Sequence, residues 1–202
     1  SNLKLASGFC PACALQRAGV NLAIGTDGCA SNNDLDMFSE TRTAALLAKA
    51  VAQDAAALDA FSALRAATLG GAKAIGFDDR VGSIEPGKEA DLVCVDLSAL
   101  ETQPLHHVVS QLIYATGRQQ VSDVWIAGRA RLRQRMLVDI GIEGVLSNAR
   151  QWRERIAGIA EADREGQVDL IGIAGVEIVE HALHRRSMAR LVQAECQGFE
   201  RR

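Results

Sequence analysis

The sequence predicts a protein of the α/β class, and three observations carry this prediction. An apolar run of strand length, Val20 to Ile24, leads into the turn Gly25-Thr26-Asp27-Gly28. A long helical pattern rich in Ala and Leu follows that turn. From Asp78 onward, turn signals and short apolar strands replace the helical pattern. One strand followed by helices is the usual order of an α/β unit, and the second region predicts a smaller β-rich part.

The first region is expected to hold one strand between helices. A short helix is predicted over residues 11–18, because Pro11 can begin it and Gly19 follows its end. A strand is predicted over residues 20–26. Asn33 or Asp34 is expected to cap the helix that comes next. The remaining helices are expected over residues 35–52 and 58–74, the second of them divided at Gly70-Gly71.

The second region is expected to be a β-rich module followed by helices. Its elements are a strand over 90–96 and a hairpin over 121–132 that turns at Gly128-Arg129. Between them, residues 108–115 are apolar enough for either a helix or a strand, and a short helix is the preferred interpretation. An amphipathic helix is predicted over 142–160, and a further helical run over 177–194. The chain is therefore divided into residues 1–77, 78–140 and 141–202.

Composition excludes several classes of protein. The chain has 202 residues, 48% of them hydrophobic, and a net charge of −3 with acids and bases interspersed. Because no basic stripe appears, a nucleic-acid partner is not expected. No apolar run approaches the roughly eighteen residues that a membrane span needs. The expected location is the cytoplasm, and five scattered cysteines fit a reducing compartment.

Two local motifs have more than one interpretation. Asp27 lies between glycines after a predicted strand, where an Asp commonly bonds its own backbone in a turn. The same position at the C-terminal end of a strand is also where α/β proteins place reactive groups. Cys10-Pro11-Ala12-Cys13 has the spacing of a redox pair, but no second pair or nearby histidine completes a metal site. Packing or chance explains this pair more simply.

Five ordered blocks of the chain resemble the metal-dependent amidohydrolase superfamily. The resemblance is to the branch that contains triazine hydrolases and 5-methylthioadenosine/S-adenosylhomocysteine deaminases, and it covers about residues 1–160. The blocks are Ser1 to Leu5, Gly19 to Gly28 with Ser31 to Asn33, Arg65 to Thr68 with Gly71 to Ala74, Gly82 to Val93, and Thr102 to Leu105 with Val109 to Leu112 and Val124 to Arg129.

This resemblance implies a fold, a reaction and a cofactor. The fold is the C-terminal portion of a (β/α)8 barrel, with residues 20–26 as its eighth strand, plus the C-terminal part of a small β-sandwich. The implied activity is hydrolytic deamination of an adenosine derivative, with zinc as cofactor and a small nucleoside as substrate. Asp27 matches the family's metal ligand, which also shuttles a proton and contacts the purine.

The resemblance also implies that most zinc ligands are missing from this chain. The family's His-x-His pair, two later histidines and catalytic Glu all fall upstream of Ser1. The chain has four histidines: His106 and His107 occupy a loop position, and His181 and His184 are three residues apart on a predicted helix, where a solvated face explains them most simply. We therefore expect a C-terminal fragment that is inactive alone and prone to associate as a homo-oligomer.

Two alternatives to the deaminase remain open at this point. One is a triazine or guanine-type hydrolase of the same superfamily, because the loops that line the pocket are not in the chain. The other is a noncatalytic module for oligomerisation or regulation that acts through the helix over 142–160.

Overall fold

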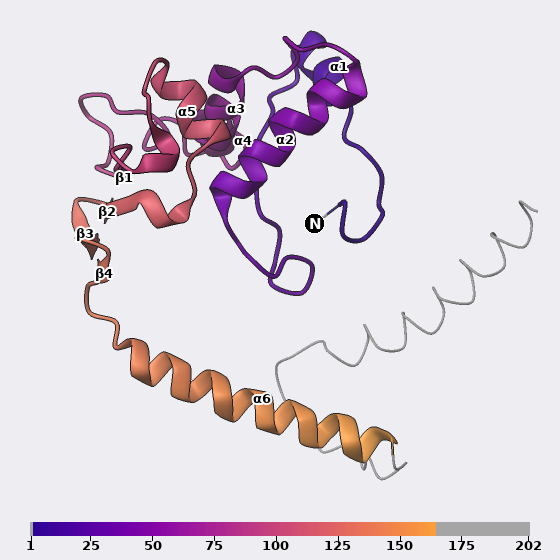
Figure 1. Ribbon diagram of the computed structural model, residues 1–202, viewed down its shortest axis with the longest axis vertical. Coiled ribbons are helices and arrows are strands. Elements are labelled where there is room, and N and C mark those ends of the chain that lie inside the picture. Colours follow the sequence, from indigo (N-terminus) through magenta and orange to yellow (C-terminus); the bar gives the residue numbers. More distant parts are fainter. Residues whose placement is uncertain (1, 165–202) are drawn as a thin grey trace, which may run out of the picture. The chain divides into compact units, whose positions relative to one another are not determined.

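The computed structural model describes residues 2–164 of the chain, which falls into two units, Ser1–Ile142 and Glu143–Arg202 (Figure 1). The predicted boundary between residues 77 and 78 lies inside the first unit and stays a prediction. The helical run predicted over 177–194, together with His181 and His184, lies outside the described residues.

The helices of the first unit lie close to where the sequence predicts them. Helices α2, α3 and α5 pack against one another, while α1 contacts α2 and α4 follows α3 directly (Figure 1). The short helix predicted over 108–115 is confirmed as α5. The bounds are α1 (Ala12–Arg17), α2 (Met37–Ala52), α3 (Ala60–Ala67), α4 (Leu69–Ala74) and α5 (Val108–Tyr114).

Two details of these helices differ from the prediction. The N-cap of α2 is Asp36, whose carboxylate accepts a hydrogen bond from the Phe38 backbone N–H at 2.9 Å, rather than Asn33 or Asp34. The break between α3 and α4 falls at Thr68, which has φ −121° and ψ −96°, rather than at the glycine pair. Gly70 lies inside α4, where the backbone of Leu22 comes so close that a side chain would have no room. Helix propensity alone does not predict this close approach.

The predicted strand over residues 20–26 is wrong for this structure, in which the segment belongs to no β-ladder. A strand forms only when a neighbouring strand shares its backbone hydrogen bonds. The sheet in the described part of the chain consists of the strands β1 to β4, which lie between residues 92 and 137, and residues 20–26 do not pair with any of these strands. The segment instead runs along α3 and α4. The Ile24 N–H donates to the Ala66 carbonyl at 3.2 Å, and the Asn21 side-chain amide donates to the Gly70 carbonyl at 2.9 Å.

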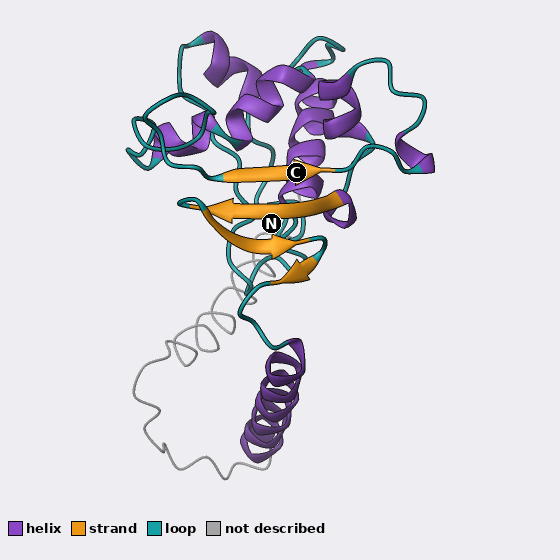
Figure 2. Ribbon diagram, turned by 90° about the vertical axis from the view of Figure 1, so that its left-hand side faces the viewer, coloured by secondary structure: helices purple, strands orange, loops and turns teal. Residues whose placement is uncertain are grey.

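Four antiparallel strands form one sheet in the order β1-β2-β3-β4, with β1 nearest the helices of the first unit (Figure 2). The predicted hairpin is confirmed, although its turn falls one residue earlier, at Ala127-Gly128. Both turn residues have positive φ, 48° and 73°, as a tight two-residue hairpin turn requires. The strands are β1 (Leu92–Val95), β2 (Val121–Ile126), β3 (Arg129–Arg133) and β4 (Met136–Leu137), and the short 3-10 helices are η1 (Leu100–Thr102) and η2 (Arg118–Gln120).

The core of the first unit joins α2, α3 and α5. Its buried cluster consists of Ala45, Ala48, Leu58, Ala63 and Ile113. Arg42, on α2, links this helix to the C-terminal end of α5. Its guanidinium donates to the Ile113 carbonyl at 3.1 Å and to the Thr116 carbonyl at 2.5 Å, and so satisfies acceptors at the C-terminal end of α5.

The amphipathic helix predicted over 142–160 is confirmed as α6 (Ile142–Arg164). Its apolar residues recur at helical spacing, and the larger ones are about half exposed, among them Val145, Trp152 and Ile156. Arg155 covers the Trp152 ring, with 4.3 Å between the guanidinium carbon and the ring centroid. Within residues 2–164, no helix is both long and apolar enough to span a bilayer.

The N-cap of α3 gives the fold an acid-sensitive contact. Asp59 accepts a hydrogen bond from the Ser62 backbone N–H at 2.8 Å. Hydrogen bonds from Ser62, first from its side chain and then from its backbone, hold the pKa of Asp59 below its ordinary value of 3.8. Because the folded-state pKa is depressed, this stabilisation is complete above the unfolded pKa and is lost as pH falls through the folded pKa.

We expect Asp59→Ala to lower the free energy of unfolding by about 0.5–2 kcal/mol at neutral pH, since an N-cap is lost. Asp59→Asn keeps a capping oxygen but carries no charge, so it serves as the matched control. The stability difference between wild type and Asp59→Asn should shrink as pH falls below 3.8. Urea unfolding at several pH values measures both effects, and a difference that grows in acid would contradict the assignment.

Candidate functional site

Asp27 lies in a tight loop between the extended segment 20–26 and α2. Its φ of 63° is left-handed, a conformation that Asp tolerates better than most residues. The two carboxylate oxygens have different partners. One accepts the Gly28 backbone N–H at 2.8 Å, and the other accepts the Ser31 hydroxyl at 2.5 Å. The sequence therefore places an exposed carboxylate in a defined orientation.

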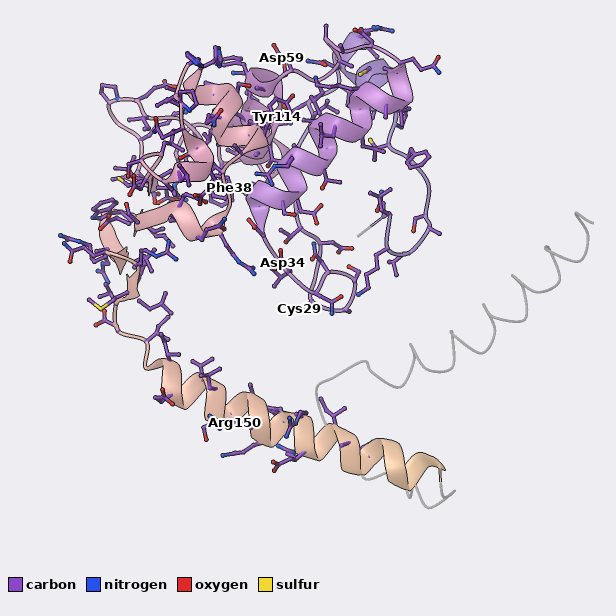
Figure 3. All side chains as sticks on the ribbon, in the orientation of Figure 1. Cys29, Asp34, Phe38, Asp59, Tyr114 and Arg150 are labelled. Carbon is purple, nitrogen blue, oxygen red and sulfur yellow. The ribbon has the colours of Figure 1, made fainter. Side chains whose placement is uncertain are left out.

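Asn32 connects this loop to helix α2. The residue is 9% exposed, and its side chain uses both ends of the amide. The amide nitrogen donates to the Thr26 carbonyl at 2.8 Å and to the Glu40 carboxylate at 2.6 Å. The amide oxygen accepts the backbone N–H groups of Asp34 and Leu35 at 2.9 and 3.3 Å. One nearly buried side chain thus fixes the backbone on both sides of Asp27. Figure 3 shows Cys29 and Asp34 on this loop, ahead of α2.

No pattern in the sequence indicates the hydrogen bonds of Asn32. Ser31 and Asn32 belong to one of the blocks that carry the family resemblance, but no role was assigned to them. The pairing of Asn32 with Glu40 depends on how the loop folds back on the first turn of α2. An Asn with a Glu eight residues later is no recognisable signal by itself.

A cavity of about 590 Å³ lies beside the loop. Its walls include apolar side chains from the 20–26 segment and from α2, such as Leu22, Ile24 and Leu47. Asn32 and Glu40 contribute polar groups to the same cavity. Asp27 is not among the lining residues, so the structure places the candidate reactive carboxylate next to this hollow rather than in its wall.

The described residues do not complete a zinc site. A tetrahedral zinc centre needs four ligands, usually histidine, cysteine or carboxylate. Within the described part of the chain, no group of three or more such side chains lies close enough together to hold a metal ion. Asp27 can therefore supply at most one corner of such a site, and the remaining ligands have to come from outside these residues.

Two of the other residues with candidate chemistry, His107 and Cys13, make structural contacts. His107 caps α5, since its Nδ1 accepts the Ser110 backbone N–H at 3.1 Å. Cys10 and Cys13 are both free thiols, and Cys13 directs its Sγ toward the Ala48 carbonyl at 3.9 Å. Packing is thus the role that the structure supports for Cys13.

The chain belongs to the amidohydrolase family, whose model matches residues 1–131. The resemblance drawn from the sequence is confirmed. Among curated relatives, a 5-methylthioadenosine/S-adenosylhomocysteine deaminase from Teredinibacter turnerae is 54% identical over 156 residues, which is 77% of this chain and 35% of the relative. One of the same name from Saccharophagus degradans is 44% identical over the same length.

Solved structures give the same family. An adenosine deaminase from Xanthomonas campestris with bound zinc is 78% identical, with a TM-score of 0.77 over 78% of this chain and 36% of that one. A zinc complex of an atrazine chlorohydrolase from Arthrobacter aurescens is 28% identical, with a TM-score of 0.68 over 73% of this chain and 33% of that one. The chain spans about a third of the length of these relatives.

Proposed function

We propose that this chain is the portion of a hydrolytic deaminase of adenosine derivatives that supplies Asp27 to the reaction centre. The observation that carries the proposal is the fixed carboxylate of Asp27, in a chain 54% identical to a 5-methylthioadenosine/S-adenosylhomocysteine deaminase. In this proposal, residues 20–26 become the last strand of a (β/α)8 barrel when the neighbouring strands are present, and residues 78–140 form part of a β-sandwich.

Zinc is the metal that we propose for the complete centre, where it would lower the pKa of a bound water. The role proposed for Asp27 is that of one metal ligand, which also accepts and returns a proton during deamination and contacts the purine. A carboxylate suits this work because it is negative at neutral pH and can take up a proton. The hydrogen bonds from Gly28 and Ser31 fix its orientation, and each oxygen can accept more than one bond.

The triazine or guanine-type alternative has weaker support. The atrazine chlorohydrolase is 28% identical and a guanine deaminase from Escherichia coli is 27% identical with a TM-score of 0.58, against 78% for the adenosine deaminase. A noncatalytic role would require that the chain never contributes to a deaminase centre. Both alternatives are open to the experiment below.

The test uses a hybrid enzyme, defined as the Xanthomonas campestris adenosine deaminase with its matching portion replaced by this full 202-residue chain. We expect the hybrid to bind zinc and to release ammonia from 5'-methylthioadenosine or S-adenosylhomocysteine. A hybrid that folds and binds zinc but releases no ammonia from these nucleosides would contradict the proposal. Hydrolysis of atrazine or guanine by that hybrid would favour the first alternative.

The 202-residue chain by itself provides the complementary prediction. Since Asp27 supplies at most one zinc ligand, we expect neither stoichiometric zinc nor deaminase activity from the purified chain. We also expect it to associate, because large apolar side chains such as Phe61, Ile75 and Trp152 are more than half exposed. Metal analysis, an ammonia-release assay and sedimentation measure these properties. Activity with bound zinc in the isolated chain would show that the ligand assignment is wrong.

A further inference from the structure

We infer that Asn32 is a positioning residue for Asp27, and that its link to Glu40 on α2 holds the reactive loop in its working shape. This inference rests on the proposed function for the identity of the reactive group. The network itself is independent of that function, since it is given by the hydrogen bonds of the loop.

The Asn32 amide meets three backbone groups and one carboxylate. Thr26 immediately precedes Asp27 in the chain, and its carbonyl accepts from the Asn32 amide nitrogen at 2.8 Å. The same nitrogen donates to Glu40 at 2.6 Å, one turn into α2. Because α2 is anchored in the core through Ala45 and Ala48, this contact fixes the loop to a rigid element.

The hydrogen bonds that join Asn32 to Thr26 and Glu40 are called the brace below. Ser31 extends this brace to the Asp27 side chain itself. Its hydroxyl lies 2.5 Å from one carboxylate oxygen and 3.2 Å from the Gly28 carbonyl. Ser31 directly precedes Asn32, so the backbone that Asn32 holds also places the Ser31 hydroxyl. Asn32 thus acts on Asp27 from two sides, through Thr26 before it and Ser31 after it. Partners of this kind set the orientation of a metal-binding or proton-transferring carboxylate.

Asn32→Asp tests the brace with almost no change of shape. The new carboxylate still accepts the backbone N–H groups of Asp34 and Leu35, but it has no donor for Thr26 and meets Glu40 with like charge. In the hybrid enzyme we expect kcat to fall by about 10- to 100-fold, because the Asp27 carboxylate is no longer held in its orientation. We also expect weaker zinc binding in a chelator competition.

A second readout does not need activity. In the 202-residue chain, amide hydrogen exchange across residues 24–36 should become faster in Asn32→Asp, since the loop loses its link to α2. Asn33→Asp is the matched control, with the same chemical change one residue later. Lys4 donates to the Asn33 side-chain oxygen at 2.5 Å, and a carboxylate keeps that acceptor.

The outcomes separate this inference from the proposed function. Faster exchange and lower kcat in Asn32→Asp, with neither change in Asn33→Asp, support the positioning role. Equal exchange in wild type and Asn32→Asp overturns it, whatever the activity of the hybrid. Unchanged kcat in an active hybrid also overturns it. A wild-type hybrid without deaminase activity argues against the proposed function, while the exchange experiment still decides the brace.

Discussion

Asp27→Asn in the hybrid enzyme is expected to lower kcat/KM by about 10²- to 10⁴-fold, the contribution typical of a positioned proton-transfer group. Asn has the same shape and tolerates the left-handed backbone that Asp27 adopts, with φ 63°. Its side-chain oxygen can still accept the Gly28 N–H, and the Ser31 hydroxyl can rotate to accept from the amide. The fold should therefore survive, while the negative charge and the proton acceptor are lost.

The measurement is steady-state ammonia release together with zinc content. Asp54→Asn is the control, because Asp54 also accepts a backbone N–H in an exposed turn, from Ala56 at 2.8 Å, and lies outside the candidate site. Activity of Asp27→Asn equal to that of Asp54→Asn would remove Asp27 from the reaction. Loss of activity with unchanged zinc content would retain its role in proton transfer but not its role as a metal ligand.

Gly70→Ala is expected to destabilise the fold, because an added side chain has no room at this position. A Cβ at Gly70 would lie 2.3 Å from the Leu22 carbonyl oxygen and 3.1 Å from the Arg65 carbonyl oxygen. Both atoms belong to the backbone, so neither can rotate away. Overpacking of this kind costs about 1–3 kcal/mol. This exceeds the roughly 0.5–1 kcal/mol that Ala gains over Gly within a helix.

The neighbouring glycine supplies the control for that experiment. A Cβ at Gly71 would have its nearest contact, the Ala66 carbonyl oxygen, at 3.9 Å, an ordinary distance. Urea unfolding of the 202-residue chain should therefore show a lower midpoint for Gly70→Ala and an unchanged or higher one for Gly71→Ala. Equal midpoints for the two variants would mean that the 20–26 segment does not approach α4 as described.

Local patterns predicted the elements that are stabilised by local interactions. The helices α1, α2, α5 and α6 and the β2–β3 hairpin follow from periodicity and turn residues, and their ends shift by only a few residues. The N-cap of α2 was missed because Asn33, Asp34 and Asp36 are all competent caps. The final choice depends on Asn32, which binds the Asp34 and Leu35 amides and so delays the start of the helix.

The elements that depend on distant partners could not be predicted in the same way. The apolar run at Val20 has the composition of a strand, but strand formation depends on a neighbouring strand, and the segment contacts helices instead. Asp27 could be singled out from its place in a family motif. The brace through Asn32 and Glu40 is set by the path of the loop, which no periodicity encodes.

The contacts of Arg42 have a consequence for how the chain folds. They join residues 71 and 74 positions apart, and Arg118 reaches back 84 positions to the Asp34 carbonyl. Ile113, which closes the core around α2, comes equally late in the sequence. The entropy of closing such long loops has to be overcome before these contacts form, which slows folding. During synthesis, the core around α2 can therefore be completed only after α5 has left the ribosome.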